Sequence, residues 1–316
     1  LFATGLGIAI GVGFAMQTAI NSQLRKFVLS PFKASMISFI VGVLILTVVM
    51  LVSGSSLGIP HETFTNQPFW IWLGGLFGVI GLTTNILLFP RIGSVQAAVM
   101  PIFGMIVMGM LIDNFGWFNS IVQPFTTNRI VGVLLLLIGI FLTVVLTELV
   151  KKRRNIANEQ DDSNSSLELW IWRIIGIGAG MLMSAQAAIN GQLGSVLGSP
   201  VHAAFVSFFV GAAILIIVVI VKERSFKDVI NPITKKAPWW VWLGGLFGAT
   251  YVLVNVYLVS EIGTGPTVIL ALFGQLTGSL LVERFGLLGS HPGDINKIHV
   301  IGLLIMLVGV IMIQSF

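Results

Sequence analysis

Amide side chains within apolar segments are the residues best able to do chemistry in this sequence. Gln17 and Asn21 lie four residues apart, and Gln186 and Asn190 repeat that spacing. Residues four apart share one face of a helix, so each pair can present two hydrogen-bonding groups to one partner. Polar groups among apolar residues hold helices together or contact a polar solute. The two interpretations are equally good for the glutamines, and contact between helices is slightly favoured for the asparagines.

Four further polar side chains could contact the same solute. Asn85 and Asn255 occupy equivalent positions in two apolar segments, and Tyr251 lies about one helical turn before Asn255. Gln275 stands where the first half of the chain has Met105. This difference would make a binding site asymmetric, as a site for an asymmetric molecule could be.

Tryptophans open two of the apolar segments, at positions 70, 72, 239, 240 and 242. Such residues usually form a belt at the level of the lipid headgroups. An aromatic cage for a cation would use the same residue type. Trp72 and Trp242 lie deepest in their segments and are the best candidates for such a cage.

Carboxylates are few, and none lies near the middle of an apolar segment. Asp113 and Glu283 occupy equivalent positions at segment ends, which makes them weak candidates for coupling to an ion. Exchange of protons for cations normally needs a carboxylate deep in the membrane, so its absence argues against that mechanism. The chain has no Cys, and its four His are scattered. We therefore predict no catalytic residue, no metal site and no cofactor, and hence no enzyme.

The composition identifies a membrane protein. Of 316 residues, 56% are hydrophobic and only 9% are charged, against roughly a quarter charged in soluble domains. An ordinary soluble enzyme and a disordered chain are both excluded. The net charge of +5 fits basic residues kept on the cytoplasmic side of a membrane, and no nucleic-acid partner is expected.

Ten stretches are long and apolar enough to be counted as transmembrane helices, which need about 20 residues each. The predicted fold class is therefore all-α, with ten transmembrane helices. The spans fall at about 2–24, 34–53, 69–89, 94–112, 130–150, 170–193, 201–221, 239–260, 264–282 and 298–315. A polar, charged linker at 151–168 separates a first unit, 1–150, from a second, 169–316.

The two units are internal repeats of one another. QTAINSQL at 17–24 matches QAAINGQL at 186–193, and PFWIWLGGLFG at 68–78 matches PWWVWLGGLFG at 238–248. Five spans per unit is an odd number, so the second unit must start on the opposite side of the membrane. The sequence thus predicts an inverted pair of five-helix repeats, an architecture of many secondary transporters, which bind substrate near the midplane.

The distribution of basic residues predicts the orientation. The loops after spans 1, 3, 5, 7 and 9 carry 16 of the 17 Lys and Arg residues, and only Arg129 lies on the other side. The positive-inside rule then places the linker in the cytoplasm and both termini outside. We expect an integral protein of the bacterial cytoplasmic membrane, with the lipid bilayer and a small-molecule substrate as partners, either monomeric or a homodimer.

Several motifs together resemble a known family. The segment Q-x-x-I-N-x-Q-L, the following Ser-Pro, the S-F-x-x-G of the second span and the P-[FW]-W-x-W-L-G-G-L-F-G stretch are similar to those of the YdcZ-like branch of the drug/metabolite transporter (DMT) superfamily. The resemblance covers both halves, as in a fused pair of five-helix units. It implies a ten-helix fold with a central cavity lined by spans 1–4 and 6–9.

Three functions remain open at this point. The leading one is a secondary transporter that moves a small polar or amphipathic metabolite by alternating access at the interface of the repeats. The second is a proton-coupled exporter of amphipathic cations or drugs that uses the tryptophans and Asp113 or Glu283. The third, of another class, is a membrane scaffold or assembly partner, which predicts no central cavity and amides fully paired with one another.

Overall fold

The computed structural model describes residues 2–54, 58–59, 61–120, 122, 124–146, 163–262, 264–290 and 297–314. Regular structure in these residues is helical, without a strand. The first half contains α1 (Phe2–Val28), α2 (Pro31–Val52), α3 (His61–Asn66), η1 (Phe69–Trp72), α4 (Gly74–Phe115), η2 (Trp117–Asn119), α5 (Thr127–Ile140) and η3 (Phe141–Leu146). The second half contains α7 (Ser163–Leu197), α8 (Pro200–Val218), η4 (Val219–Glu223), η5 (Lys227–Ile230), α9 (Asn231–Thr234), η6 (Trp239–Trp242), α10 (Gly244–Ile262), α11 (Thr264–Phe285), η7 (Leu287–Gly289) and α12 (Lys297–Gln314).

Helices able to cross a membrane dominate the described part of the chain. Six stretches meet the requirements of length and apolarity: Phe2–Val28, Pro31–Val52, Gly74–Gly93, Val95–Phe115, Leu167–Leu197 and Pro200–Glu223. Shorter apolar helices lie at Thr127–Ile140, Gly244–Leu258 and Lys297–Met312. These helices confirm the prediction of an all-helical membrane protein.

Helix α4 contains the third and fourth predicted spans, which are separated by a break at Gly93. This glycine has φ 77° and ψ 169°, a conformation that interrupts the helix and that residues with a side chain rarely adopt. The two parts, Gly74–Gly93 and Val95–Phe115, overlap the predicted 69–89 and 94–112, and their boundaries differ from the prediction by 5, 4, 1 and 3 residues. Residues 69–72 form the short turn η1 instead, as residues 239–242 form η6 before α10.

The Ser-Pro motifs start the two equivalent helices α2 and α8. The Ser30 hydroxyl accepts hydrogen bonds from the backbone N–H of Phe32 (3.1 Å) and Lys33 (3.3 Å). Ser199 accepts one from the N–H of His202 at 3.3 Å. A serine cap followed by proline in the first turn satisfies amide groups that the helix itself cannot pair.

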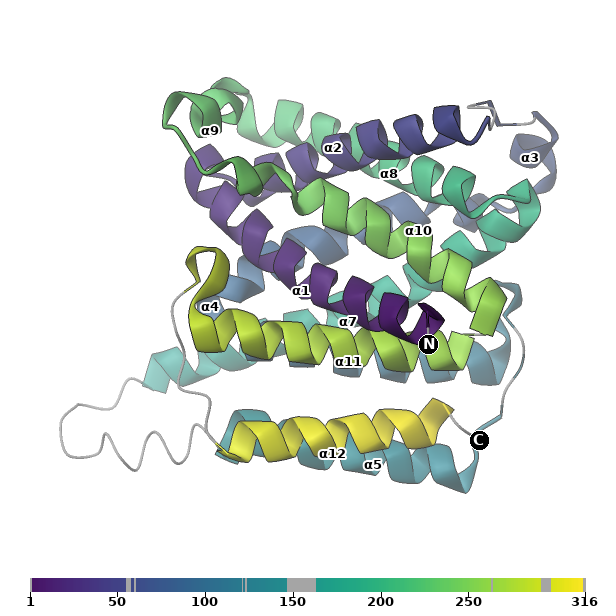
Figure 1. Ribbon diagram of the computed structural model, residues 1–316, viewed down its shortest axis with the longest axis vertical. Coiled ribbons are helices and arrows are strands. Elements are labelled where there is room, and N and C mark those ends of the chain that lie inside the picture. The colour runs from purple at the N-terminus through teal and green to yellow at the C-terminus, as the bar shows by residue number, and fades with distance from the viewer. Residues whose placement is uncertain are drawn as a thin grey trace.

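The helices run roughly parallel or antiparallel across the molecule (Figure 1). α1 begins and α12 ends at one end of this array, which we name the terminus end. α5 and η3 run toward the opposite end, where α7 begins and which we name the linker end. α7 begins at Ser163, within the segment predicted as linker, and residues 151–162 lie outside the described residues.

Contacts between helices in one half recur in the other. α1 packs on α11 as α7 packs on the second part of α4, while α2 pairs with α8 and α5 with α12. Glycines bring the backbones together: a β-carbon at Gly274 would overlap the Ile8 carbonyl, and one at the equivalent Gly104 would overlap the Ile177 carbonyl. Close approach through small residues is how helices associate where no water is available to drive them together.

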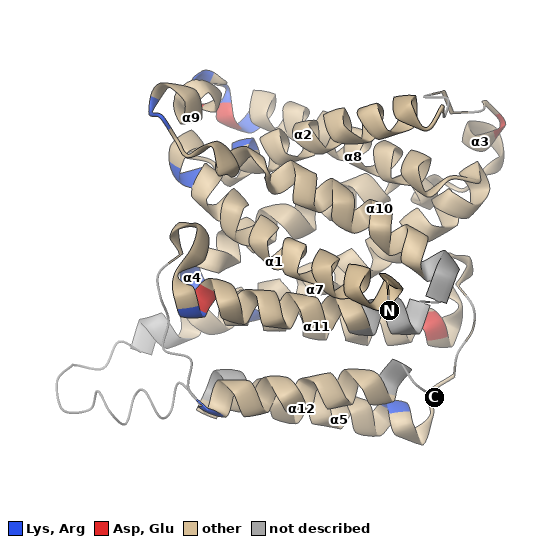
Figure 2. Cartoon of the chain, in the orientation of Figure 1, with Lys and Arg blue, Asp and Glu red and all other residues tan. Residues whose placement is uncertain are grey.

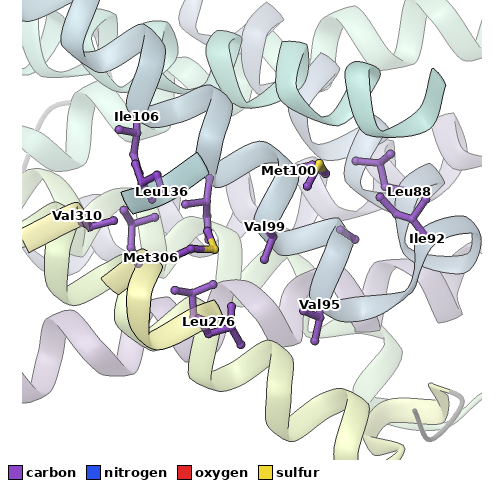
Figure 3. Close-up of a cluster of buried hydrophobic side chains, with 14 of the residues drawn as sticks. Leu88, Ile92, Val95, Val99, Met100, Ile106, Leu136, Leu276, Met306 and Val310 are labelled. Atoms are coloured by element: carbon purple, nitrogen blue, oxygen red, sulfur yellow. The ribbon is translucent and has the colours of Figure 1, made fainter. Parts of the chain in front are cut away.

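The largest apolar cluster joins α4, α5, α11 and α12. Leu136 of α5 and Met306 of α12 are fully buried beside Leu276 of α11. Figure 3 shows these side chains converging with residues on both sides of the α4 break, including Ile92 and Val95. The cluster fixes the outlying pair α5 and α12 to the rest of the molecule.

Candidate substrate site

Glycine faces receive the amides of α1. The side chain of Gln17 is 5% exposed and lies against Gly248 of α10, while the fully buried Asn21 lies against Gly244 one turn earlier. Any side chain at either glycine would overlap these amide groups. The L-G-G-L-F-G motif therefore makes room on α10 for two polar side chains of α1.

The same arrangement recurs between α7 and α4. Gln186 lies against Gly78, and the buried Asn190 lies against Gly74. The structure thus gives the four predicted amides one common setting, in two copies. In each copy a helix with two amides faces a helix with two glycines.

Hydrogen bonding differs between the two copies. Asn21 donates from Nδ2 to the Ser38 hydroxyl of α2 at 3.3 Å, while its own Oδ1 has no partner. In the second copy, Asn190 Oδ1 and Ser207 Oγ are both buried without a hydrogen bond. Buried polar atoms without partners are rare and costly. These oxygens could accept hydrogen bonds from a solute.

The crossing of α2 and α8 packs against a helix of each copy, α2 on α10 and α8 on α4. The rings of Phe39 and Phe208 meet with their centroids 4.9 Å apart, each against a glycine of the opposite helix. Those glycines are Gly42 and Gly211, so the S-F-x-x-G motif builds this crossing. The sequence contains the motif twice, but its repetition alone did not identify these residues as part of the site.

The flanking polar residues make the two copies unequal. Asn85 is buried, with its Nδ2 4.0 Å from the Met183 sulfur and its Oδ1 unpartnered. Its equivalent Asn255 interacts with Tyr251, whose ring lies 4.7 Å from that of Phe14. Phe14 and Met183 are equivalent positions, so two aromatic rings on one side face a thioether on the other.

Gln275 is buried on α11 at 4% exposure, where its backbone packs closely against Gly11 of α1. The equivalent Met105 leaves the other copy without this amide. The two α1–α11 and α7–α4 contacts therefore carry different side chains at this position, and an asymmetric binding site stays a prediction.

The structure does not bring Trp72 and Trp242 together. Trp72 stacks on Phe64 with ring centroids 4.8 Å apart at the terminus end, while Trp242 packs against a cluster around Leu24 and Val28 at the linker end. Trp72 also lines an apolar cavity of about 450 Å³. The other lining residues of this cavity are Ile59, Phe64, Phe205, Val206, Phe209 and Val210.

A second apolar cavity of about 240 Å³ lies between α5 and α12, lined by Leu135, Ile301, Leu304, Ile305 and Val308. Neither cavity is lined by the predicted amides. In this conformation the glycine faces are filled by the amides themselves.

The two equivalent acids have different partners. Asp113, at the terminus end, pairs with the buried Arg129 at 3.6 Å. Glu283, at the linker end, accepts a hydrogen bond at 2.8 Å from the backbone N–H of Val95, just after the break in α4. Asp113 thus compensates a buried cation, whereas Glu283 caps a helix.

Sequence reasoning missed a cluster of charges at the linker end. Lys33 is 3% exposed, and its Nζ lies 2.7 Å from Asp228 Oδ2 and 3.5 Å from Glu223 Oε2. The hydrogen bond from Lys33 holds the pKa of the Asp228 carboxyl below its usual range. The one available signal was that Lys33 stands where the second half has His202. Figure 2 shows how charged residues gather at the helix ends and leave the middle of the array without charge.

Comparison with known proteins identifies both the family and the fold. A family model with the description "Putative inner membrane exporter, YdcZ" matches residues 2–142 and again 171–312. One solved structure, titled only as the crystal structure of a protein, aligns over 98% of both chains with a TM-score of 0.60 and 14% sequence identity. No curated protein matches the chain at a significant level. The double match covers most of the chain, and the solved structure supports the fold alone.

Proposed function

The chain belongs to the YdcZ family of the DMT type, and from this premise we propose that it is a secondary transporter that exports a small polar or amphipathic metabolite. Substrate would bind at the interface of the two halves and be released by alternating access. The description of the family as an inner membrane exporter supports two parts of this proposal. These are transport out of the cell and a location in the inner membrane.

The proposed architecture is ten spans in two inverted five-helix repeats. The family model matches twice, and α4 supplies two helical stretches separated at Gly93. α1 begins and α12 ends at the same end of the array, as an even number of spans requires (Figure 1). Basic residues gather at the linker end, which supports a cytoplasmic position for it and an outer position for the terminus end.

One observation carries the proposal: the same contact, a pair of amide side chains on a glycine face, occurs twice in equivalent positions. Gln17 and Asn21 fill the face on α10, and Gln186 and Asn190 fill the face on α4. Inverted repeats let one such contact open while the other stays closed, which is the principle of alternating access. A solute that entered an opened face would meet the amides and the unpartnered oxygens of Asn21 or Asn190.

The geometry favours this function over the other two. A cation exporter would need an acid free to exchange partners beside an aromatic cage, but Asp113 pairs with Arg129, Glu283 caps Val95, and the tryptophans lie at opposite ends. A scaffold would have no central cavity and amides fully paired with one another. The two apolar cavities are not lined by the amides, so they do not separate a scaffold from a transporter. Several buried amide oxygens have no partner, which counts against a scaffold.

The test is transport by protein reconstituted in lipid vesicles. A screen for stabilisation of the detergent-solubilised protein by metabolites first supplies a substrate, because a ligand that binds the folded state raises its stability. We expect Gln17→Ala and Gln186→Ala each to reduce transport about tenfold or more, which corresponds to about 1.4 kcal/mol of lost interaction.

The matched control is Gln67→Ala. Gln67 lies at the terminus end, between α3 and η1, away from the glycine faces. It should leave transport unchanged. Normal transport by both site variants, in protein that elutes and melts like the wild type, would overturn the proposed site.

A further inference from the structure

An ion-paired cluster at the linker end ties the start of α2 to η4 and η5, which follow α8 in the chain. The ammonium of Lys33 contacts Asp228 and Glu223, and the Ser30 hydroxyl donates to Glu223 Oε1 at 2.5 Å. The side chain of Lys33 is 3% exposed, whereas those of Glu223 and Asp228 are 21% and 33% exposed. The cation is therefore enclosed and its partners border on water.

Neighbouring contacts extend the cluster to α1. Asn231 Nδ2 donates to the Phe27 carbonyl at 3.0 Å and also to Asp228 Oδ1 at 3.3 Å. The Lys222 ammonium lies 4.5 Å from the centre of the Phe32 ring. Residues of the second half thus hold the turn between α1 and α2 from several directions.

Among the residues that the structure describes, the terminus end has no equivalent of this cluster. His202 stands at the position of Lys33, and its buried Nε2 has no hydrogen bond. Gly54 stands at the position of Glu223, so no carboxylate is available there at that position. The two ends of the α2 and α8 pair, which share a central crossing at Phe39 and Phe208, are therefore closed by different forces.

We propose that the cluster of Ser30, Lys33, Glu223 and Asp228 is a latch that closes the cytoplasmic end of the substrate path and must open for substrate to enter from that side. The inference rests on the proposed function. α2 and α8 are antiparallel and cross at their middles, so opening the linker end separates Lys33 from the end of α8. Breaking an ion pair of which one member is enclosed is costly unless water reaches the freed charge. The half-buried acids border on water, and an opening path would let that water reach the lysine.

The chain offers a direct test because it has no cysteine of its own. Ser38 and Ser207 are buried, equivalent positions seven residues beyond Pro31 and Pro200. S38C therefore reports access from the linker end, and S207C reports access from the terminus end. Each would be labelled in membrane vesicles of either orientation with a thiol reagent that does not cross the bilayer.

We expect Lys33→Ala to raise the labelling rate of S38C from the cytoplasmic side several-fold and to lower that of S207C from the outside. Asp228→Asn, a milder change at a half-buried partner, should act in the same direction to a smaller extent. Lys33→Arg keeps the charge and should stay close to the parent. His202→Ala, the matched change at the other end, should not raise S38C labelling.

The possible outcomes distinguish failure of the latch proposal from failure of the proposed transport by alternating access. Labelling of both parent reporters with no response to Lys33→Ala or Asp228→Asn would overturn the latch and leave alternating access standing. If neither reporter were labelled in any folded variant, no path would open at this interface. That result would overturn both proposals.

Discussion

The two halves of this protein share their glycine contacts in the interior and differ in their charges at the helix ends. Gly104 and Gly274 approach the backbone of the facing helix in the same way, and both glycine faces hold an asparagine and a glutamine. Yet Lys33 has two carboxylates where His202 has none, and Asp113 and Glu283 have different partners. Interior packing thus follows the repeat, whereas each end carries its own charges. A transporter built this way can have two similar conformations of unequal stability.

The largest effect should come from breaking a glycine contact that both halves share. Gly104→Ala and Gly274→Ala would each press a methyl group into a backbone carbonyl that cannot turn aside. We expect each to destabilise the protein by about 1–3 kcal/mol, measured by unfolding in mixed detergent micelles.

Gly178→Ala is the control, since nothing lies within 4 Å of the added carbon. It should be neutral or raise stability by up to about 1 kcal/mol through helix propensity. A loss at Gly104 without a similar loss at Gly274 would show that the interior contacts of the two halves are not energetically equivalent.

The amide pairs and glycine motifs of the interior were predictable because each occurs in both repeats. The paired amides and the glycine motifs were visible in the sequence, as were the approximate positions of the apolar helices. The partners of these residues could not be predicted, because the spacing of residues along one helix does not indicate which other helix they contact. The glycine that accommodates Gln17 is Gly248, more than two hundred residues away.

The charged cluster at the linker end was harder to predict because it has no second copy. Lys33 meets acids 190 and 195 residues later, in a segment where α8 continues as the π-helix η4. The tryptophan segments were predicted as helix starts, but they form separate 3₁₀ turns after Pro68 and Pro238. Hydrophobicity alone cannot distinguish such turns from the first turn of a span.

Asp113 and Glu283, which occupy equivalent positions, allow a sharper comparison of the two halves. We expect their replacement to change stability less than the glycine substitutions do. Asp113→Asn removes the charge that compensates the buried Arg129, which we expect to cost about 1–3 kcal/mol after allowance for the partial exposure of Asp113. Glu283→Gln keeps an oxygen that can accept from Val95 and loses only charge near a helix N-terminus, worth about 0.3–1 kcal/mol. Thermal unfolding of the two variants side by side measures the difference, and an equal loss would contradict the distinct roles assigned to the two acids.

The smallest effect is a dependence on pH at the latch. Lys33 donates a hydrogen bond to Asp228 and lowers its pKa, and Lys235 and Asn231 act in the same direction. A carboxyl with a lowered pKa in the folded state stabilises the fold above its unfolded pKa of about 4, and this contribution is lost as the pH falls through the lower folded value. The gap in melting temperature between wild type and Asp228→Asn should therefore be constant from about pH 5 to 8 and shrink only below about pH 4. A gap that changed near pH 6 would point to a histidine coupled to the latch, and His202 at the other end would be the first to replace.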